Sequence, residues 1–275
     1  MIPLHNILVP IDFTQRSTHA VKQATLLAQK SGSKLILFHA YHRPMVPAGV
    51  EAEVEKSFLK KRARSIEKKF DELVNDIPTL KEVNYSLHKT LGKSTDSIVN
   101  SVEKLQVDLI VMGTKGAHGF EEIWGSNAAK VAEKAQCPVL ILPDEADLSN
   151  LKKIGFACDF NQNKKIKMLD YLPFLAKVLN TKINVIYVSL DPKDRHPREY
   201  KQAIKIHRKL EDIPHSFDYV YNKNIEDGLV NYCKDNDIGL LAIMPKSRNI
   251  FEKLFSESLT KQMVYHIDVP MLILK

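Results

Sequence analysis

Short apolar runs and longer amphipathic segments alternate along the whole chain. Most of the runs have the composition of strands that are buried on both faces, and one of them alternates apolar and polar residues. Between the runs, apolar residues recur at helical spacing. In the first part of the chain the pattern predicts strands at 4–10, 34–40, 83–89, 109–112 and 139–142. It predicts helices between 17 and 32 and at 51–75, 94–104 and 126–135.

The second part of the chain repeats this order with a shorter middle. The predicted strands lie at 154–158, 183–187, 217–221, 240–244 and 269–274. The predicted helices run through 169 and 179, around 198–209 and over 225–234. Strands that alternate with helices pair in parallel through right-handed crossovers. We therefore expect an α/β fold of two tandem, doubly wound, Rossmann-like parallel sheets with helices on both faces.

The repeat is also visible in the letters of the sequence. Residues 6–13 recur as residues 153–160, and each run ends on Asp-Phe. The closing residues 137–142 recur as 269–274. The chain length of 275 residues fits two domains of ordinary size. We predict one domain over 1–145, the first half, and another over 150–275, the second half.

The helix expected at 51–75 places Val54, Phe58, Ala63, Ile66, Phe70 and Leu73 on one side. Its basic stretch at 60–64 has two interpretations, a nucleic-acid contact or a solvated helix face. Apolar positions interrupt the stretch and acidic residues follow it, which favours the solvated face. The net charge of +7 is spread over both halves, so we expect no specific nucleic-acid partner.

Composition sets further limits on the function. No apolar run approaches the about 18–20 residues that cross a bilayer, and the start lacks a signal-peptide pattern. We therefore expect a cytoplasmic protein without a membrane partner. The three cysteines have no CxxC spacing and are interpreted as buried structural thiols. The histidines are scattered, so we expect no metal site, and no group of residues resembles catalytic machinery.

Glycines follow one strand of the first half and precede its last helix. Gly113 and Gly116 come directly after the strand at 109–112, and Gly125 precedes Ser126. Glycine allows close backbone approach to a ligand, and a helix start offers free N–H groups to an anion. With Lys115 and the side chains of Ser126 and Asn127, this segment is interpreted as a cradle for nucleotide phosphates. The alternative is that the glycines only shape a loop.

Asp12 follows the first strand and also has two interpretations. It caps the first helix, or it faces a ligand at the end of the sheet. The second half keeps the aspartate but not the glycines. It has Pro245-Lys246-Ser247-Arg248 and Glu257-Ser258 where the first half has its glycine segment. We therefore expect no phosphate site there.

These residues resemble the universal stress protein family, as two UspA-type domains in one chain. The resemblance covers nearly the whole length and is carried by 7–12, 111–116, 125–127 and 137–139. It implies that the first half binds ATP or a related adenine nucleotide, with Mg²⁺ as the accompanying ion. Pro10, Asp12 and the backbone of Ala40 would surround the adenine and neighbouring groups. Met112, Gly113, Lys115 and Gly116 would line the ribose and phosphates. Gly125, Ser126 and Asn127 would close over the phosphates.

One departure from the family pattern concerns the phosphate loop. The ATP-binding branch has Gly-x2-Gly-x9-Gly-Ser/Thr, whereas residues 117–124 of this chain make eight positions and not nine. A residue of extended chain spans about 3.3 Å, so the shortened loop could re-aim Gly125.

The resemblance implies a stress-response or regulatory binding protein and not an efficient enzyme. One alternative is a slow ATPase that uses His118, Glu121 or Glu122 in the loop. Another is an interaction scaffold that needs no nucleotide. We expect the two halves to pair within one chain, with further homodimerisation left open and the protein partner unknown.

Overall fold

The computed structural model describes residues 3–42, 52–114, 126–158, 169–191, 193, 197–244 and 269–275. The first half forms β1 (Asn6–Pro10), α1 (Gln15–Ser31), β2 (Lys34–Tyr41), α2 (Ala52–Asp76), the short 3₁₀ helix η1 (Pro78–Glu82), β3 (Tyr85–Leu91), α3 (Ser94–Lys104), β4 (Leu109–Gly113), α4 (Ser126–Lys134) and β5 (Val139–Leu142). The second half forms β6 (Lys153–Ala157), α5 (Tyr171–Leu179), β7 (Lys182–Ser189), α6 (Pro197–Lys209), β8 (His215–Tyr221), α7 (Ile225–Asp235), β9 (Leu240–Ile243) and β10 (Met271–Ile273). Each predicted strand and helix is present, and η1 is an addition that the pattern did not indicate.

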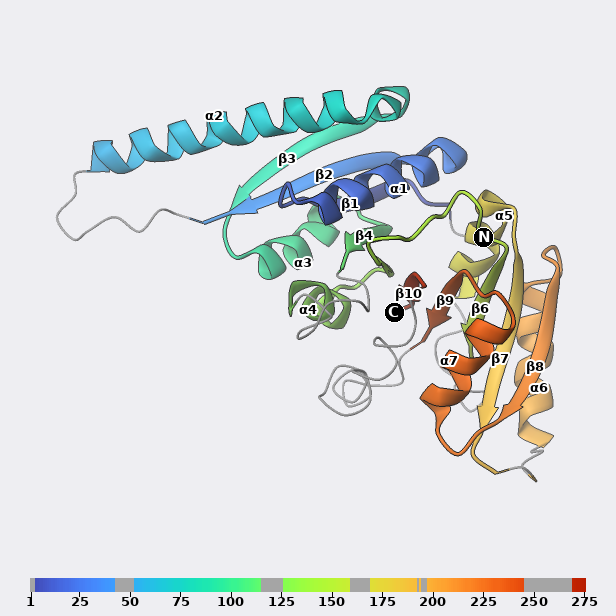
Figure 1. The fold of residues 1–275 in the computed structure, drawn as a ribbon. Coiled ribbons are helices and arrows are strands. Elements are labelled where there is room, and N and C mark those ends of the chain that lie inside the picture. Colours follow the sequence, from blue (N-terminus) through green and yellow to red (C-terminus); the bar gives the residue numbers. More distant parts are fainter. Residues whose placement is uncertain are drawn as a thin grey trace.

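The strands of the described residues form one sheet in the order β3-β2-β1-β4-β5-β10-β9-β6-β7-β8. Each half therefore has the same doubly wound order, read outward from the middle of the sheet (Figure 1). Neighbouring strands within each half are parallel. β5 and β10 pair antiparallel and join the two halves. The expected fold, an α/β protein with two tandem doubly wound sheets, is confirmed.

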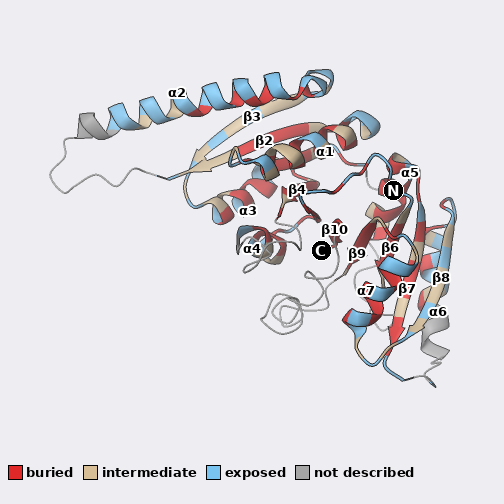
Figure 2. Ribbon diagram, in the orientation of Figure 1, coloured by how far each residue is buried: buried red, intermediate tan, exposed pale blue. Residues whose placement is uncertain are grey.

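Helices cover both faces of the sheet, as the apolar runs predicted. The side chains of β1 alternate between two cores: Ile7 and Val9 pack in one with residues of α1 and α2, and Leu8 packs in the other with residues of α3 and α4. In Figure 2 the central strands are mostly buried, and exposed residues follow the outer faces of the helices. Strands buried on both faces explain why the sequence shows continuous apolar runs.

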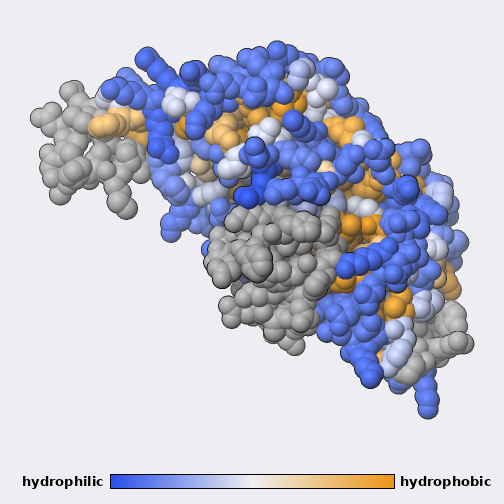
Figure 3. All heavy atoms as spheres, in the orientation of Figure 1, coloured by the Kyte–Doolittle hydropathy of each residue, from blue (hydrophilic) through white to orange (hydrophobic). Residues whose placement is uncertain are grey.

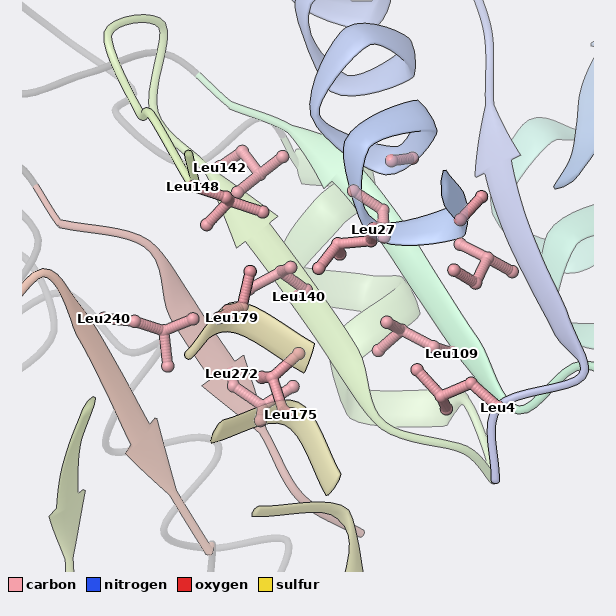
Figure 4. Close-up of a cluster of buried hydrophobic side chains, with 14 of the residues drawn as sticks. Leu4, Leu27, Leu109, Leu140, Leu142, Leu148, Leu175, Leu179, Leu240 and Leu272 are labelled. Atoms are coloured by element: carbon pink, nitrogen blue, oxygen red, sulfur yellow. The ribbon is translucent and has the colours of Figure 1, made fainter. Parts of the chain in front are cut away.

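The core continues across the pairing of the two halves. Leu140 on β5 lies opposite Leu272 on β10 in the antiparallel register, and both are almost completely buried. Figure 4 shows these two leucines beside Leu175 and Leu179 of α5. We call this set the seam. Its shared burial means that neither half is enclosed without the other.

Helix α2 differs from the sequence prediction at one end. Ile66, Phe70 and Leu73 are buried as expected, but Phe58 is 51% exposed. Figure 1 shows α2 extending past the sheet at its beginning, so no strand of the described part of the chain covers this part of its apolar face. Lys60 is exposed to solvent, which both interpretations of the basic stretch allow. Hydrophilic residues cover much of the molecular surface around α2 (Figure 3).

The cysteines follow the prediction in two cases of three. Cys137 and Cys233 are buried, and burial raises the pKa of each thiol to about 12. Cys158 is only half-buried, because it follows the end of β6 and not the middle of an element. Within the described ranges, no helix is long and apolar enough to cross a bilayer, and no three His, Cys, Asp or Glu side chains are grouped to bind a metal ion.

The seam predicts a large effect from a single truncation. Leu140→Ala leaves a cavity between the halves and should lower the free energy of unfolding by about 2–5 kcal/mol. Leu190→Ala is the control, because Leu190 is 57% exposed. Urea denaturation followed by circular dichroism compares the two. Equal midpoints for both variants would contradict the role given to the seam.

Candidate functional site

A cavity of about 310 Å³ opens at the carboxyl edge of the first half of the sheet. The ends of β1, β2 and β4 and the first turns of α1, α3 and α4 surround it. β1 and β4 are neighbours at the point where the strand order reverses, which is where doubly wound sheets bind ligands. The lining residues are Pro10, Ile11, Asp12, Thr14, Arg16, Ser17, Phe38, Ala40, Ser94, Ile98, Met112, Gly113, Thr114, Asn127 and Ala128.

The structure brings together most of the residues that the sequence proposed for a site. Pro10, Asp12, Ala40, Met112, Gly113 and Asn127 all line the cavity. Ser126 is the first residue of α4, and only its backbone is described. Lys115, Gly116 and Gly125 lie outside the described residues, as do His118, Glu121 and Glu122. The contact of any of these residues with a ligand stays a prediction.

Three helices begin at the rim of the cavity. α1 starts at Gln15, α3 at Ser94 and α4 at Ser126. The first N–H groups of a helix have no partner within the helix, and they carry its positive dipole end. Asn127 adds a side-chain amide, whose oxygen accepts a hydrogen bond of 3.1 Å from the Thr95 hydroxyl. The arrangement is suited to a ligand with negative charge.

The turn between β1 and α1 holds a strained residue. Phe13 has a φ of 65°, in the left-handed region that bulky side chains avoid at a cost of about 1–3 kcal/mol. Its ring packs against His39 and edge-on against Phe70, with centroids 4.8 and 5.2 Å away. The Nδ1 atom of His39 in turn lies 2.6 Å from the carbonyl oxygen of Ile11. These contacts fix the turn and therefore the position of Asp12.

Asp12 does not cap the first helix. The N-cap is Thr14, whose side chain accepts from the Ser17 N–H, and Asp12 holds Thr14 in place. The Asp12 carboxylate accepts hydrogen bonds from the Thr14 hydroxyl at 2.6 Å and the Thr14 N–H at 3.0 Å. Burial would raise the pKa of Asp12, but the bonds from Thr14 and Ser17 outweigh it and keep that pKa below its usual range. Asp12 is thus a carboxylate at the cavity at neutral pH.

Gly113 has a packing reason to be glycine. A Cβ atom at this position would lie 2.6 Å from the carbonyl oxygen of Arg16 in the first turn of α1. Backbone cannot move aside cheaply, so a side chain here would push α1 away from β4. The interpretation of this glycine as a shaping residue thus has direct support, and it does not exclude contact with a ligand.

Several lining residues were not proposed from the sequence. Thr14 and Ser17 are polar residues in the turn after the first strand, so their chemistry was visible in the sequence but not their place at the cavity. Ser94 could have been found from its position as the first residue of a helix that follows a strand. Arg16 has no signal in the sequence, because its place depends on the packing of α1 against β4.

The equivalent edge of the second half carries larger side chains. The registers β1–β2 and β6–β7 make Val188 the counterpart of Ala40. The registers with β4 and β9 make Met244, and not Pro245, the counterpart of Gly113. The pairing of Gly113 with Pro245 in the sequence was wrong by one residue, because the connections between the strands differ in length. Met244 packs against the hydrophobic core. Residues 245–268 lie outside the described part.

An acidic group also lies at the second edge. Glu226 is in the first turn of α7, as Thr95 is in the first turn of α3. Its side chain is buried, and its Oε2 atom has no hydrogen-bond partner among the described residues. Burial, followed by the charge of Asp227, raises the pKa of this carboxyl. A buried carboxyl in this place is unfavourable for binding a phosphate.

Comparison with known proteins gives a consistent result. The model of the universal stress protein family matches residues 3–143. A universal stress protein A homologue of Coxiella burnetii is 28% identical over 136 residues, which are 49% of this chain and 93% of that protein. A universal stress protein of Methanocaldococcus jannaschii is 31% identical over 142 residues, which are 50% of this chain and 80% of that protein.

Solved structures of similar length resemble both halves together. The crystal structure of a universal stress protein from Archaeoglobus fulgidus has a TM-score of 0.74 and 16% sequence identity. The match covers 98% of this chain and 96% of that chain. At this identity the likeness establishes the fold.

The hydrogen bonds of Asp12 predict the behaviour of a Thr14→Val variant. The variant loses the N-cap and the hydroxyl donor, so unfolding should become easier by about 1–2 kcal/mol at neutral pH. The Asp12 pKa should rise toward its usual value. Because a lowered pKa stabilises the fold above the unfolded pKa of about 3.9, the difference from wild type should shrink as the pH falls below it.

NMR titration of the carboxyl carbons measures this change. Asp147 is the internal control, since hydrogen bonds from Ser149 lower its pKa independently of Thr14. An Asp12 pKa that does not move in the variant would show that the Thr14 hydroxyl does not stabilise the carboxylate.

Proposed function

We propose that this chain, which belongs to the universal stress protein family, binds an adenine nucleotide in the cavity of its first half. In this proposal the bound nucleotide biases a conformation that a protein partner reads, so that the protein acts in regulation and not as an efficient enzyme. The observation that carries the proposal is the convergence of three helix N-termini on a cavity at the reversal of strand order.

The cavity has an apolar part and a charged part. Phe38, Ile98 and Met112 supply an apolar wall of the kind that a purine base packs against. Asp12, ionised at neutral pH, can accept hydrogen bonds from a ribose hydroxyl or an exocyclic amine. The helix starts and Arg16 supply positive potential for phosphates. The cavity thus offers a suitable group to the base, to the sugar and to the phosphates of a nucleotide.

The dimensions and the donors fit a nucleotide. Ligand cavities usually measure about 300–1,000 Å³, and this one lies at the lower end. Such a volume suits the nucleoside, with the phosphates extending along Gly113 toward the start of α4. Since the described residues offer no cluster of metal ligands, Mg²⁺ would arrive with the phosphates and be held mainly by them.

The second half has a structural function in this proposal. Val188 and Met244 stand where the first half has the smaller Ala40 and Gly113, and Glu226 places a carboxyl near the helix start. Its β10 covers the edge of β5 and completes the seam. The second half thus supplies the partner that the first half needs in order to be enclosed.

A slow ATPase is the enzymatic alternative. Histidine and cysteine are missing from the described lining of the cavity, and Asp12 already accepts two hydrogen bonds from Thr14. This composition favours binding over water activation. A phosphate-release assay with Mg-ATP would detect turnover directly.

Calorimetry on ligand-stripped protein tests nucleotide binding. Wild type should bind ATP with one site per chain. Ala40→Val copies the residue of the second half into the cavity. The overpacking costs about 1–3 kcal/mol, so ATP binding should weaken by about ten-fold or more. Val188→Ala, at the equivalent place in the second half, should leave the affinity within about two-fold, since a distant site does not couple.

The result that would contradict the proposal is an absence of heat with ATP, ADP and AMP in protein that is folded by circular dichroism. Equal weakening by both variants would instead place the binding site outside the cavity.

A further inference from the structure

Arg16 lies at the cavity in an unusual electrostatic position. It is in the first turn of α1, and no acidic residue accompanies it there. A cation near the positive end of a helix is unfavourable, whereas anions are preferred at that place. The cost is reduced by Asp144, whose carboxylate oxygens lie 3.3 and 3.4 Å from Nε of Arg16. The helix start by itself therefore gives no reason for an arginine at this position.

The ion pair between Arg16 and Asp144 is weak enough to be exchanged. The side chains are 41% and 46% exposed, and exposed pairs contribute little because water screens them. In the described structure Arg16 contacts Asp144 through its Nε atom. The two terminal nitrogens of the guanidinium do not take part in this contact. A planar guanidinium with free donors is well suited to a phosphate.

Asp144 connects this pair to the segment between the two halves. It follows β5 by two residues, and Leu148 of the same connector donates its N–H to the side-chain oxygen of Gln23 on α1. Both contacts come from α1, the helix whose first turn borders the cavity. A change of partner at Arg16 thus releases one of these two attachments of the connector to α1.

We propose that Arg16 selects for ligand charge, and that a bound phosphate replaces Asp144 as its partner. The inference rests on the proposed binding of an adenine nucleotide and adds the residue that distinguishes a nucleotide from a nucleoside. Asp144 then acts as an internal competitor: it holds Arg16 in the free protein and gives it up when an anion is bound.

The two partners should act in opposite directions. Arg16→Gln should weaken ATP binding by about ten-fold or more, since a hydrogen bond to a charged group contributes about 1.5–3 kcal/mol. Asp144→Asn should strengthen ATP binding by about two- to five-fold, the amount by which an exposed ion pair competes. Adenosine, which has no phosphate, should bind each variant within about two-fold of wild type, because nothing charged meets Arg16.

Calorimetry with ATP, AMP and adenosine on the full chain measures these effects. Lys22→Gln on α1 and Glu145→Gln beside Asp144 are matched controls, since both residues are exposed and absent from the cavity lining. Arg16→Lys keeps the charge and should retain more ATP affinity than Arg16→Gln. Thermal denaturation verifies that each variant is folded.

The double variant Arg16→Gln, Asp144→Asn separates competition from a general charge effect. Without Arg16, the gain from Asp144→Asn should disappear. A gain that persists in the double variant, or an Arg16→Gln variant that binds ATP like wild type, would overturn the inference while nucleotide binding stands. If wild type binds neither ATP nor adenosine, the proposed function fails and the role of Arg16 fails with it.

Discussion

Parallel pairing of β1 with both β2 and β4 is the constraint on which the rest of the structure depends. Parallel strands all end at the same edge, and each strand is followed there by the start of a helix or loop. Because the chain reverses its strand order between β1 and β4, helices from opposite faces of the sheet begin on the two sides of one crevice. The cavity, its apolar wall and its positive rim all follow from this geometry.

The antiparallel seam explains why the fold is present twice. An unpaired β5 would expose a strand of four buried residues, Val139–Leu142, at the edge of the sheet. β10 covers this edge with a strand of the same kind, and α5 packs over both. A copy that serves this purpose needs its core and its edge strand but not its pocket. The larger residues Val188 and Met244 at the second edge agree with that division of function.

Much of the fold could be predicted because the spacing of apolar residues along the chain reflects the local secondary structure. Strands buried on both faces gave continuous apolar runs, and α3 begins and ends where the pattern placed it. The sequence predictions were wrong where contacts between distant parts of the chain determine the structure. Phe58 has the right spacing for the core, but α2 extends past the sheet at that point. The counterpart of Gly113 was off by one residue, because register depends on strand pairing and not on letter alignment.

The candidate site was predictable to a similar degree. Residues at strand ends, such as Pro10, Asp12 and Met112, follow from the rule that ligands bind at the carboxyl edge. Ser94 could have been found by the same rule, whereas Arg16 comes to the cavity through the packing of α1 against β4, which the sequence does not display. The glycine segment at 115–125 and the domain boundary near 145–150 stay predictions.

NMR spectra of ¹⁵N-labelled, ligand-stripped protein during an ATP titration test the central claim most directly, because they locate the bound nucleotide. Thr14 is the N-cap of α1 and Ser94 is the first residue of α3, both at the proposed cavity, and Ile225 begins the helix at the equivalent place in the second half. The amide signals of Thr14 and Ser94 should shift and saturate together, while that of Ile225 stays in place. Amides at the first edge that do not move with ATP, or equal shifts at Ile225, would contradict the claim.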